Sequence, residues 1–166
     1  MSGDALAGAH ALMSFRDSCR GETWRETRRE NNHERSPSEG VSVLLIDGTD
    51  AETQEILASL AECQNPKFTV RHVSDPKEAQ HVWREHKHDL VIIDVWLGRG
   101  VSVELVSLLT NSPCSCPVVM LSSLSSEELQ AFFTDANLFI HSKKNITPSA
   151  LARTLETALS GSDDAL

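Results

Sequence analysis

The sequence has no run of about 18 apolar residues, the length that a membrane-spanning helix needs. Residues 1–15 lack the basic start and the continuous apolar core of a secretory signal peptide. The four cysteines are too few and too scattered for a disulfide scaffold: Cys19, Cys63, Cys114 and Cys116. These absences predict a soluble, cytoplasmic protein with no membrane partner.

Positive charge is also scarce. The 166 residues include 15 Lys and Arg against 24 Asp and Glu, which gives a formal net charge of -9. A nucleic-acid partner is therefore not expected, because binding to phosphates requires clustered cations. The sequence also lacks a G-x-G-x-x-G or P-loop motif, which argues against a nucleotide-binding Rossmann domain or an NTPase.

The composition changes near residue 40. Residues 16–35 are dense in Arg and Glu, and Trp24 is their only large apolar residue. Such a segment cannot bury enough apolar surface to offset the entropy of ordering it. Whether residues 4–18 form a short partner-binding helix stays open. The chain is therefore divided into a flexible N-terminal arm over 1–40, a folded domain over 41–160 and a C-terminal tail over 161–166.

Short apolar segments alternate with amphipathic segments after residue 40. Five segments rich in aliphatic and β-branched residues are predicted as strands: 41–46, 68–73, 89–94, 117–121 and 138–141. Each is followed by a segment with apolar residues at helical spacing. This alternation predicts an α/β fold, a five-stranded, parallel, doubly wound sheet of the flavodoxin-like type with five helices.

Three helix starts are marked by their capping residues. Asp75 precedes Pro76, which suits a side-chain cap followed by a proline at the first helical position. Ser125 and Glu128 have the spacing of a capping box. Thr147 precedes the proline that opens the last predicted helix. These signals fix where three of the helices begin.

Polar residues follow four of the predicted strands. Asp47 follows the first strand, Asp94 the third and Ser122 the fourth, and Lys143 and Lys144 follow the fifth. Open parallel sheets bind ligands at the carboxyl ends of their strands. Carboxylates there can hold Mg²⁺ through oxygen, and one carboxylate can act as a nucleophile toward a phosphoryl group. A hydroxyl and an ammonium suit the phosphoryl oxygens.

Four segments, in this order, resemble the receiver domain of two-component response regulators: VLLIDGTD at 43–50, DLVIIDVWLGRG at 89–100, PVVMLSS at 117–123 and LFIHSKKNITP at 138–148. The resemblance covers residues 41–160. It implies the strand order 2-1-3-4-5 and a phosphoprotein that acts in a phosphorelay. Each segment is weak evidence alone, but their order and spacing together are specific.

The resemblance also implies a role for each residue of the site. Asp94 would be the phosphoacceptor that attacks a phosphohistidine, and Mg²⁺ would be held by Asp47, Asp94 and the backbone carbonyl of Trp96. Ser122 would follow the phosphoryl group and reshape the signalling face. Lys143 would contact the phosphoryl oxygens.

The sequence departs from the family pattern after the first predicted strand, and the position of the site lysine stays open. Gly48 stands where the family usually has a second acidic residue, which weakens the attraction for a hard cation. Asp50 is a candidate ligand in its place, and its position equally suits a helix cap. Counting back from the proline after Thr147 favours Lys143 as the site lysine. Counting forward from residues 135–136 favours Lys144 or Ser142.

The favoured interpretation is a stand-alone receiver that accepts a phosphoryl group on Asp94 from a histidine kinase or phosphotransfer protein. It would signal by contact with a downstream protein target and would not be an enzyme beyond its own phosphorylation and dephosphorylation. Gly48 favours the alternative of a pseudo-receiver, a constitutive binding module without phosphoryl chemistry. A small phosphatase-like enzyme is disfavoured because Trp96, not an acid, stands two residues after Asp94. Whether the chain forms a homodimer stays open.

Overall fold

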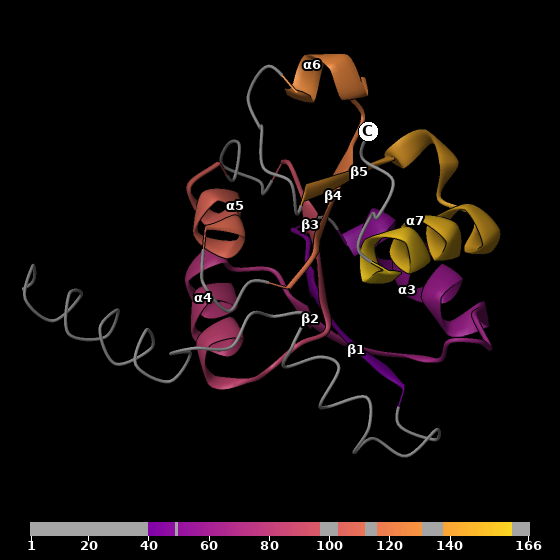
Figure 1. Ribbon diagram of the computed structural model, residues 1–166, viewed down its shortest axis with the longest axis horizontal. Coiled ribbons are helices and arrows are strands. Elements are labelled where there is room, and N and C mark those ends of the chain that lie inside the picture. Colours follow the sequence, from indigo (N-terminus) through magenta and orange to yellow (C-terminus); the bar gives the residue numbers. More distant parts are fainter. Residues whose placement is uncertain (1–39, 49, 97–102, 112–115, 131–137, 161–166) are drawn as a thin grey trace, which may run out of the picture.

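The computed structural model describes residues 40–48, 50–96, 103–111, 116–130 and 138–160. Within these ranges, five parallel strands form one sheet in the order β2-β1-β3-β4-β5 (Figure 1). The strands are β1 (Val41–Ile46), β2 (Phe68–Val73), β3 (Leu90–Asp94), β4 (Val118–Ser122) and β5 (Leu138–Ser142). The predicted fold and strand order are confirmed. The predicted arm, as far as residue 39, and the predicted tail over 161–166 lie outside the described ranges.

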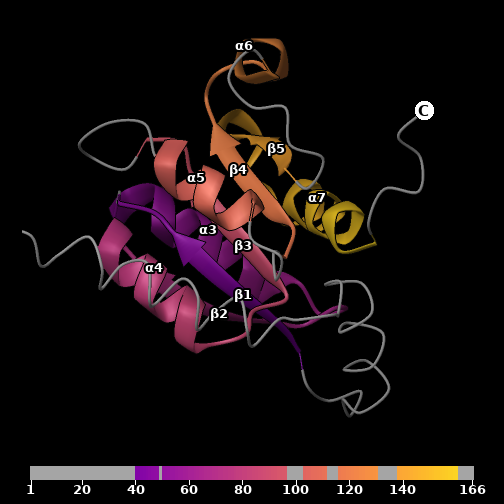
Figure 2. The ribbon, with the colours of Figure 1, turned by 60° about the vertical axis from the view of Figure 1, so that its left-hand side comes forward.

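Helices cover both faces of the sheet (Figures 1 and 2). The helices are α3 (Asp50–Glu62), α4 (Pro76–Glu85), α5 (Val103–Thr110), α6 (Ser126–Gln130) and α7 (Pro148–Ser160), with a short 3₁₀ helix at Lys143–Asn145. α3 and α7 pack together on one face, and α4 and α5 cover the other. None of the helices in the described ranges is long and apolar enough to cross a membrane.

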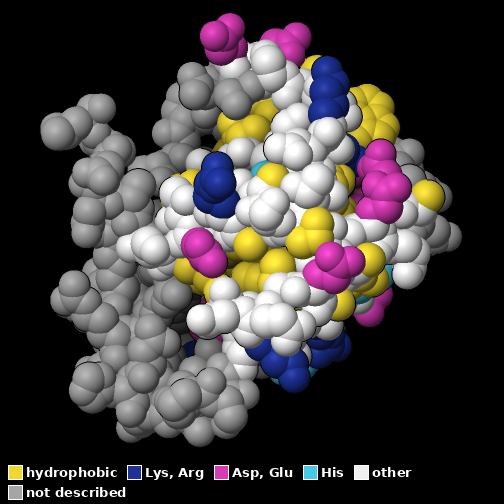
Figure 3. Space-filling view, turned by 90° about the vertical axis from the view of Figure 1, so that its right-hand side faces the viewer, with side chains coloured by type: hydrophobic (Ala, Val, Ile, Leu, Met, Phe, Trp, Pro, Cys, Tyr) yellow, Lys and Arg dark blue, Asp and Glu magenta, His cyan; other side chains and the backbone are white. Residues whose placement is uncertain are grey.

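The sheet separates two hydrophobic cores, because successive side chains of a strand point to opposite faces. In β1, Leu44 and Ile46 pack under α4 and α5, whereas Val43 and Leu45 pack under α3 and α7. This two-sided burial explains why the central strands read as continuous apolar runs. On the outside of the α3 and α7 face, apolar side chains lie between charged ones (Figure 3).

The three predicted helix starts are confirmed. The Asp75 carboxylate accepts two backbone N–H groups of the first turn of α4, each at 2.9 Å, and Pro76 occupies the first turn. Ser125 donates its backbone N–H to the Glu128 carboxylate at 2.8 Å, and the Glu128 N–H reaches the Ser125 hydroxyl at 3.3 Å. The Thr147 hydroxyl accepts a backbone N–H of α7 at 3.3 Å.

Two strands begin one residue later than predicted. Asp89 lies before β3 because its carboxylate and its N–H both bond to the backbone of Ser42, at 2.8 Å each. Pro117 precedes β4, and its lack of an N–H leaves it nothing to donate to the sheet. Its carbonyl still accepts the N–H of Val91 at 3.0 Å. These contacts hold the amino ends of the central strands together, opposite the candidate site.

Candidate functional site

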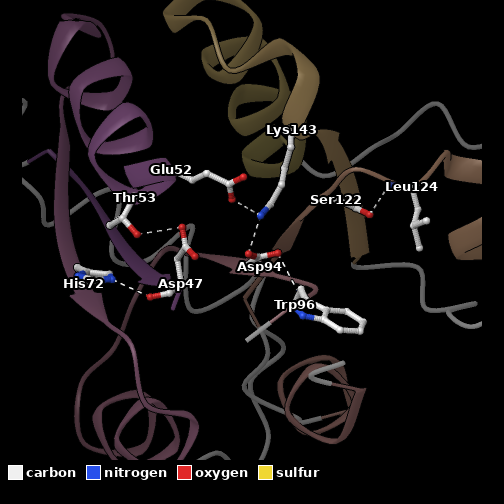
Figure 4. A network of polar contacts seen from close by, with 9 residues as sticks. All are labelled: Asp47, Glu52, Thr53, His72, Asp94, Trp96, Ser122, Leu124 and Lys143. Carbon is white, nitrogen blue, oxygen red and sulfur yellow. Dashed lines mark hydrogen bonds and ion pairs between the residues drawn. The ribbon is translucent and has the colours of Figure 1, made fainter. Parts of the chain in front are cut away.

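The parallel sheet brings the predicted polar residues to a single edge (Figure 4). Asp47 follows β1 and Asp94 ends β3, which is the neighbouring strand. Ser122 ends β4, and Lys143 directly follows β5. Asp47, Asp94 and Ser122 are at most 2 % exposed, and the Lys143 side chain is 11 % exposed. Polar groups with so little access to water require partners within the protein.

Lys143 is the lysine that reaches the carboxylate of Asp94. Its Nζ donates to Asp94 Oδ2 at 2.6 Å and to a second carboxylate, Glu52 on the first turn of α3. Lys144 is exposed and donates its backbone N–H to the Ser142 hydroxyl, which caps the 3₁₀ helix. Among the three residues that the spacing left open, the structure therefore places Lys143 at Asp94.

Asp94 accepts hydrogen bonds on both oxygens. The backbone N–H of Trp96 donates to Oδ1 at 2.9 Å, and Lys143 occupies Oδ2. Burial raises the pKa of Asp94, and the nearby Asp47 charge adds to the rise; the bonds to Lys143 and Trp96 offset part of it. Burial lowers the pKa of Lys143, but its bonds to Asp94 and Glu52 outweigh that effect, so this pKa is raised. The ammonium therefore stays charged at neutral pH.

Asp47 is fixed by two neighbouring elements. Thr53, in the first two turns of α3, donates its hydroxyl to Asp47 Oδ2 at 3.0 Å. Nε2 of His72, on β2, lies 2.9 Å from the backbone carbonyl of Asp47. Because a carbonyl oxygen only accepts, this nitrogen must carry the proton. The end of β1 is thus anchored to both α3 and β2.

Ser122, the last residue of β4, bonds to the segment that follows the strand. Its hydroxyl oxygen accepts the backbone N–H of Leu124 at 2.9 Å. Figure 4 shows Ser122 and Leu124 on one side of Asp94, with Asp47 on the other. Trp96 and Leu124 are 61 % and 46 % exposed, so apolar side chains border the site.

The residues expected to hold a metal are two carboxylates and one residue that offers its backbone carbonyl. Within the described residues, no group of three or more His, Cys, Asp or Glu side chains could hold a metal ion. The side chain of Asp50, a predicted ligand, lies outside what the structure describes. Asp47 and Asp94, with the carbonyl of Trp96, still fit Mg²⁺, which keeps several waters and often takes only one or two protein carboxylates.

Sequence reasoning missed two residues of this network, Glu52 and Thr53. Neither belongs to a motif, and Glu52 lies 91 positions from its partner Lys143. Thr53 follows Asp47 by six positions. This spacing brings the two side chains together because α3 begins at Asp50 and its first residues face the end of β1. The only available signal was the position of both residues at the start of a helix that follows a strand-end carboxylate.

Solved structures with a similar fold include a chemotaxis response regulator and receiver domains of signalling proteins. The chemotaxis response regulator CheY4 of Vibrio cholerae is 21 % identical with a TM-score of 0.62, over 73 % of this chain and all of that one. The receiver domain of an HD domain-containing protein from Pseudomonas fluorescens Pf-5 is 19 % identical with a TM-score of 0.64, over 76 % and 91 %. At these identities the likeness shows the fold. No curated protein matches the chain.

A receiver domain in a histidine kinase from Syntrophus aciditrophicus shares the fold at 20 % identity and a TM-score of 0.61, over 76 % of this chain and 96 % of that one. The family evidence comes from the sequence itself. The family model described as the response regulator receiver domain matches residues 43–156, which is well over half of the chain and spans all five strand-helix units. The chain therefore belongs to the response regulator receiver domain family.

Proposed function

We propose that this protein accepts a phosphoryl group on Asp94 from the phosphohistidine of a histidine kinase or phosphotransfer protein. It then passes on its state by contact with a downstream protein. The observation that carries the proposal is the bond between Lys143 and Asp94 at the buried end of β3. A nucleophilic carboxylate with an ammonium at its oxygen is the arrangement that phosphoryl acceptance needs.

Each residue has a defined task in the transfer. An oxygen of Asp94 attacks the phosphorus, the phosphorus–nitrogen bond of the donor breaks, and the histidine leaves with the electron pair. Lys143 and the Ser122 hydroxyl would then stabilise the phosphoryl oxygens, because both lie at the same strand edge. Asp47, Asp94 and the Trp96 carbonyl would hold Mg²⁺. When bound, the metal would neutralise charge on the transferring group.

A second candidate function rests on Gly48. With one carboxylate fewer than the usual acidic pair, the site could lack the metal that transfer requires, and the domain would act as a binding module in one fixed state. This pseudo-receiver would use the same fold and leave Asp94 unmodified. The two candidates therefore differ in one measurable property, the phosphorylation of Asp94.

Intact mass spectrometry after incubation with acetyl phosphate and Mg²⁺ separates the two candidates. A receiver gains the mass of one phosphoryl group, the adduct is labile in base, and Asp94→Asn abolishes the gain. Asp75→Asn is the matched control, because it is the same substitution at an exposed carboxylate whose hydrogen bonds go to the first turn of α4. Labelling of the Asp94→Asn variant to the same extent would refute the assignment. The absence of any adduct on the unaltered chain would favour the pseudo-receiver.

A further inference from the structure

The ammonium of Lys143 lies between two carboxylates from different parts of the fold. Asp94 belongs to the end of β3, and Glu52 belongs to the first turn of α3 (Figure 4). The Asp94 side chain is 2 % exposed, whereas that of Glu52 is 43 % exposed. One side of the ammonium therefore faces the protein interior, and the other faces a carboxylate at the border with solvent.

Glu52 is not placed to act as a metal ligand. It does not join Asp47 and Asp94 in a group that could hold a metal, although all three are carboxylates near the same edge. Its hydrogen bond goes to the lysine. The chain thus has no carboxylate at Gly48 but has one at Glu52. This carboxylate bonds to the Lys143 ammonium.

Sharing the ammonium has a direct consequence for Asp94. If Asp94 were the only carboxylate partner of Lys143, the ammonium would interact with Asp94 alone. It would then compete there with any other cation. A second carboxylate draws part of this interaction away. It also limits the rotamers of a long side chain that would otherwise lose considerable entropy on ordering.

We propose that Glu52 is a positioning residue of the phosphoacceptor site: it holds the Lys143 ammonium between two carboxylates and so leaves Asp94 able to bind a divalent cation. This inference rests on the proposed function for its biological meaning. The geometry that it describes exists in the unphosphorylated protein and can be tested without phosphorylation.

The first test measures the Lys143 ammonium without metal. NMR of ¹⁵N-labelled protein gives the rate at which the side-chain ammonium of Lys143 exchanges its protons with water. Glu52→Gln removes the charge, and Glu52→Asp keeps the charge but shortens the reach. We expect exchange to become about threefold faster in both variants, in keeping with the loss of one partly exposed ion pair. Glu62→Gln, at the other end of α3, changes the net charge equally and should leave the rate unchanged.

The second test measures the affinity for Mg²⁺ alone, through the chemical shift of the Trp96 amide, which is bonded to Asp94. We expect both Glu52 variants to bind Mg²⁺ about fivefold more weakly. An effect of this order is expected when a unit charge moves near a divalent cation in a partly solvated site. Adding Gly48→Asp to Glu52→Gln should restore the affinity, because it supplies a carboxylate beside Asp47.

Two results would overturn the inference: a Lys143 exchange rate that is the same in both Glu52 variants as in the unaltered chain, or an Mg²⁺ affinity that Glu52→Asp leaves unchanged. The second would show that only the charge of Glu52 matters, not its position. If neither the unaltered chain nor Gly48→Asp binds Mg²⁺, the metal-dependent function fails, and the exchange rates alone decide whether Glu52 positions Lys143.

Discussion

Replacing Asp94 by asparagine should stabilise the folded, unphosphorylated domain at pH 7. Asp94 is 1 % exposed, and its pKa is raised by burial and by the Asp47 charge even though Lys143 and the Trp96 N–H bond to its carboxylate. A raised pKa means that the folded state disfavours the charged form relative to the unfolded chain. The asparagine side chain has nearly the same shape and carries no charge.

The size of the effect follows from gains and losses at the same atoms. The substitution removes the cost of desolvating a charge and the repulsion from Asp47. It also gives up the charge-assisted bond to Lys143, which is worth roughly 1.5–3 kcal/mol. Because the raised pKa shows that the costs are larger, we expect a net gain of about 1 kcal/mol in the free energy of unfolding, on the scale of a single hydrogen bond. That corresponds to a rise of about 4 °C in Tm for a domain of this size.

The pH dependence has a defined sign. Above the folded-state pKa of Asp94, the unaltered protein bears the full cost of the buried charge. As the pH falls through that raised value toward the ordinary value of 3.8, the folded protein takes up a proton and the cost disappears. The advantage of Asp94→Asn should therefore be complete at pH 7 and should shrink as the pH approaches 4.

Thermal and urea unfolding of the two proteins between pH 4 and pH 7.5, without Mg²⁺, tests this reasoning. Asp75→Asn serves as the control, because asparagine caps a helix as well as aspartate does and no change in Tm is expected. A lower Tm for Asp94→Asn at pH 7 would show that the bond to Lys143 outweighs the cost of burial. A difference that stays constant with pH would show that protonation of Asp94 is not its cause.

Three further predictions concern the metal, a helix cap and the arm. Asp47→Asn should abolish Mg²⁺ binding and Gly48→Asp should strengthen it, because each changes the number of carboxylates at the site. The measurement is an Mg²⁺ titration followed by NMR, and an affinity that Gly48→Asp leaves unchanged would contradict this geometry. Asp75→Ala should lower the stability by about 1 kcal/mol in urea unfolding, because it removes the acceptor for two N–H groups of α4. Removing residues 1–38 should leave Tm within a few degrees, since residues 16–35 offer almost no core-forming side chains, and a drop beyond about 8 °C would show that the arm contributes to the fold.

The sequence was sufficient to predict the architecture, because the signals involved are local. Runs such as residues 90–93 are apolar at every position, as required of a strand buried on both faces, and residues 43–46 of β1 and 118–121 of β4 have the same character. The cap at Asp75 and the capping box at Ser125 and Glu128 are likewise contained within a few residues. Alternation of strands and helices then allows few topologies.

The position of Asp47 and Asp94 could also be predicted. Both residues directly follow or end an apolar strand, and a parallel sheet brings all such positions to one edge. The alternation of strands and helices was therefore enough to place Asp47 and Asp94 at the same site, although they are 47 positions apart in the sequence. The exact start of β3 was predicted one residue early, because the pairing of Asp89 with the backbone of Ser42 is not visible in the apolar pattern.

Only the tertiary structure decided which groups touch. The spacing left Lys143, Lys144 and Ser142 as candidates, and the turn after β5 selects Lys143 by the direction in which its side chain leaves the chain. Glu52 and Thr53 gained their partners because α3 packs with its amino end against the carboxyl edge of the sheet. Contacts of this kind depend on the relative placement of whole elements, which no local pattern encodes. The sequence thus determined the sheet and its two acidic strand ends, whereas the packing of α3 and the turn after β5 determined the charges that surround Asp94.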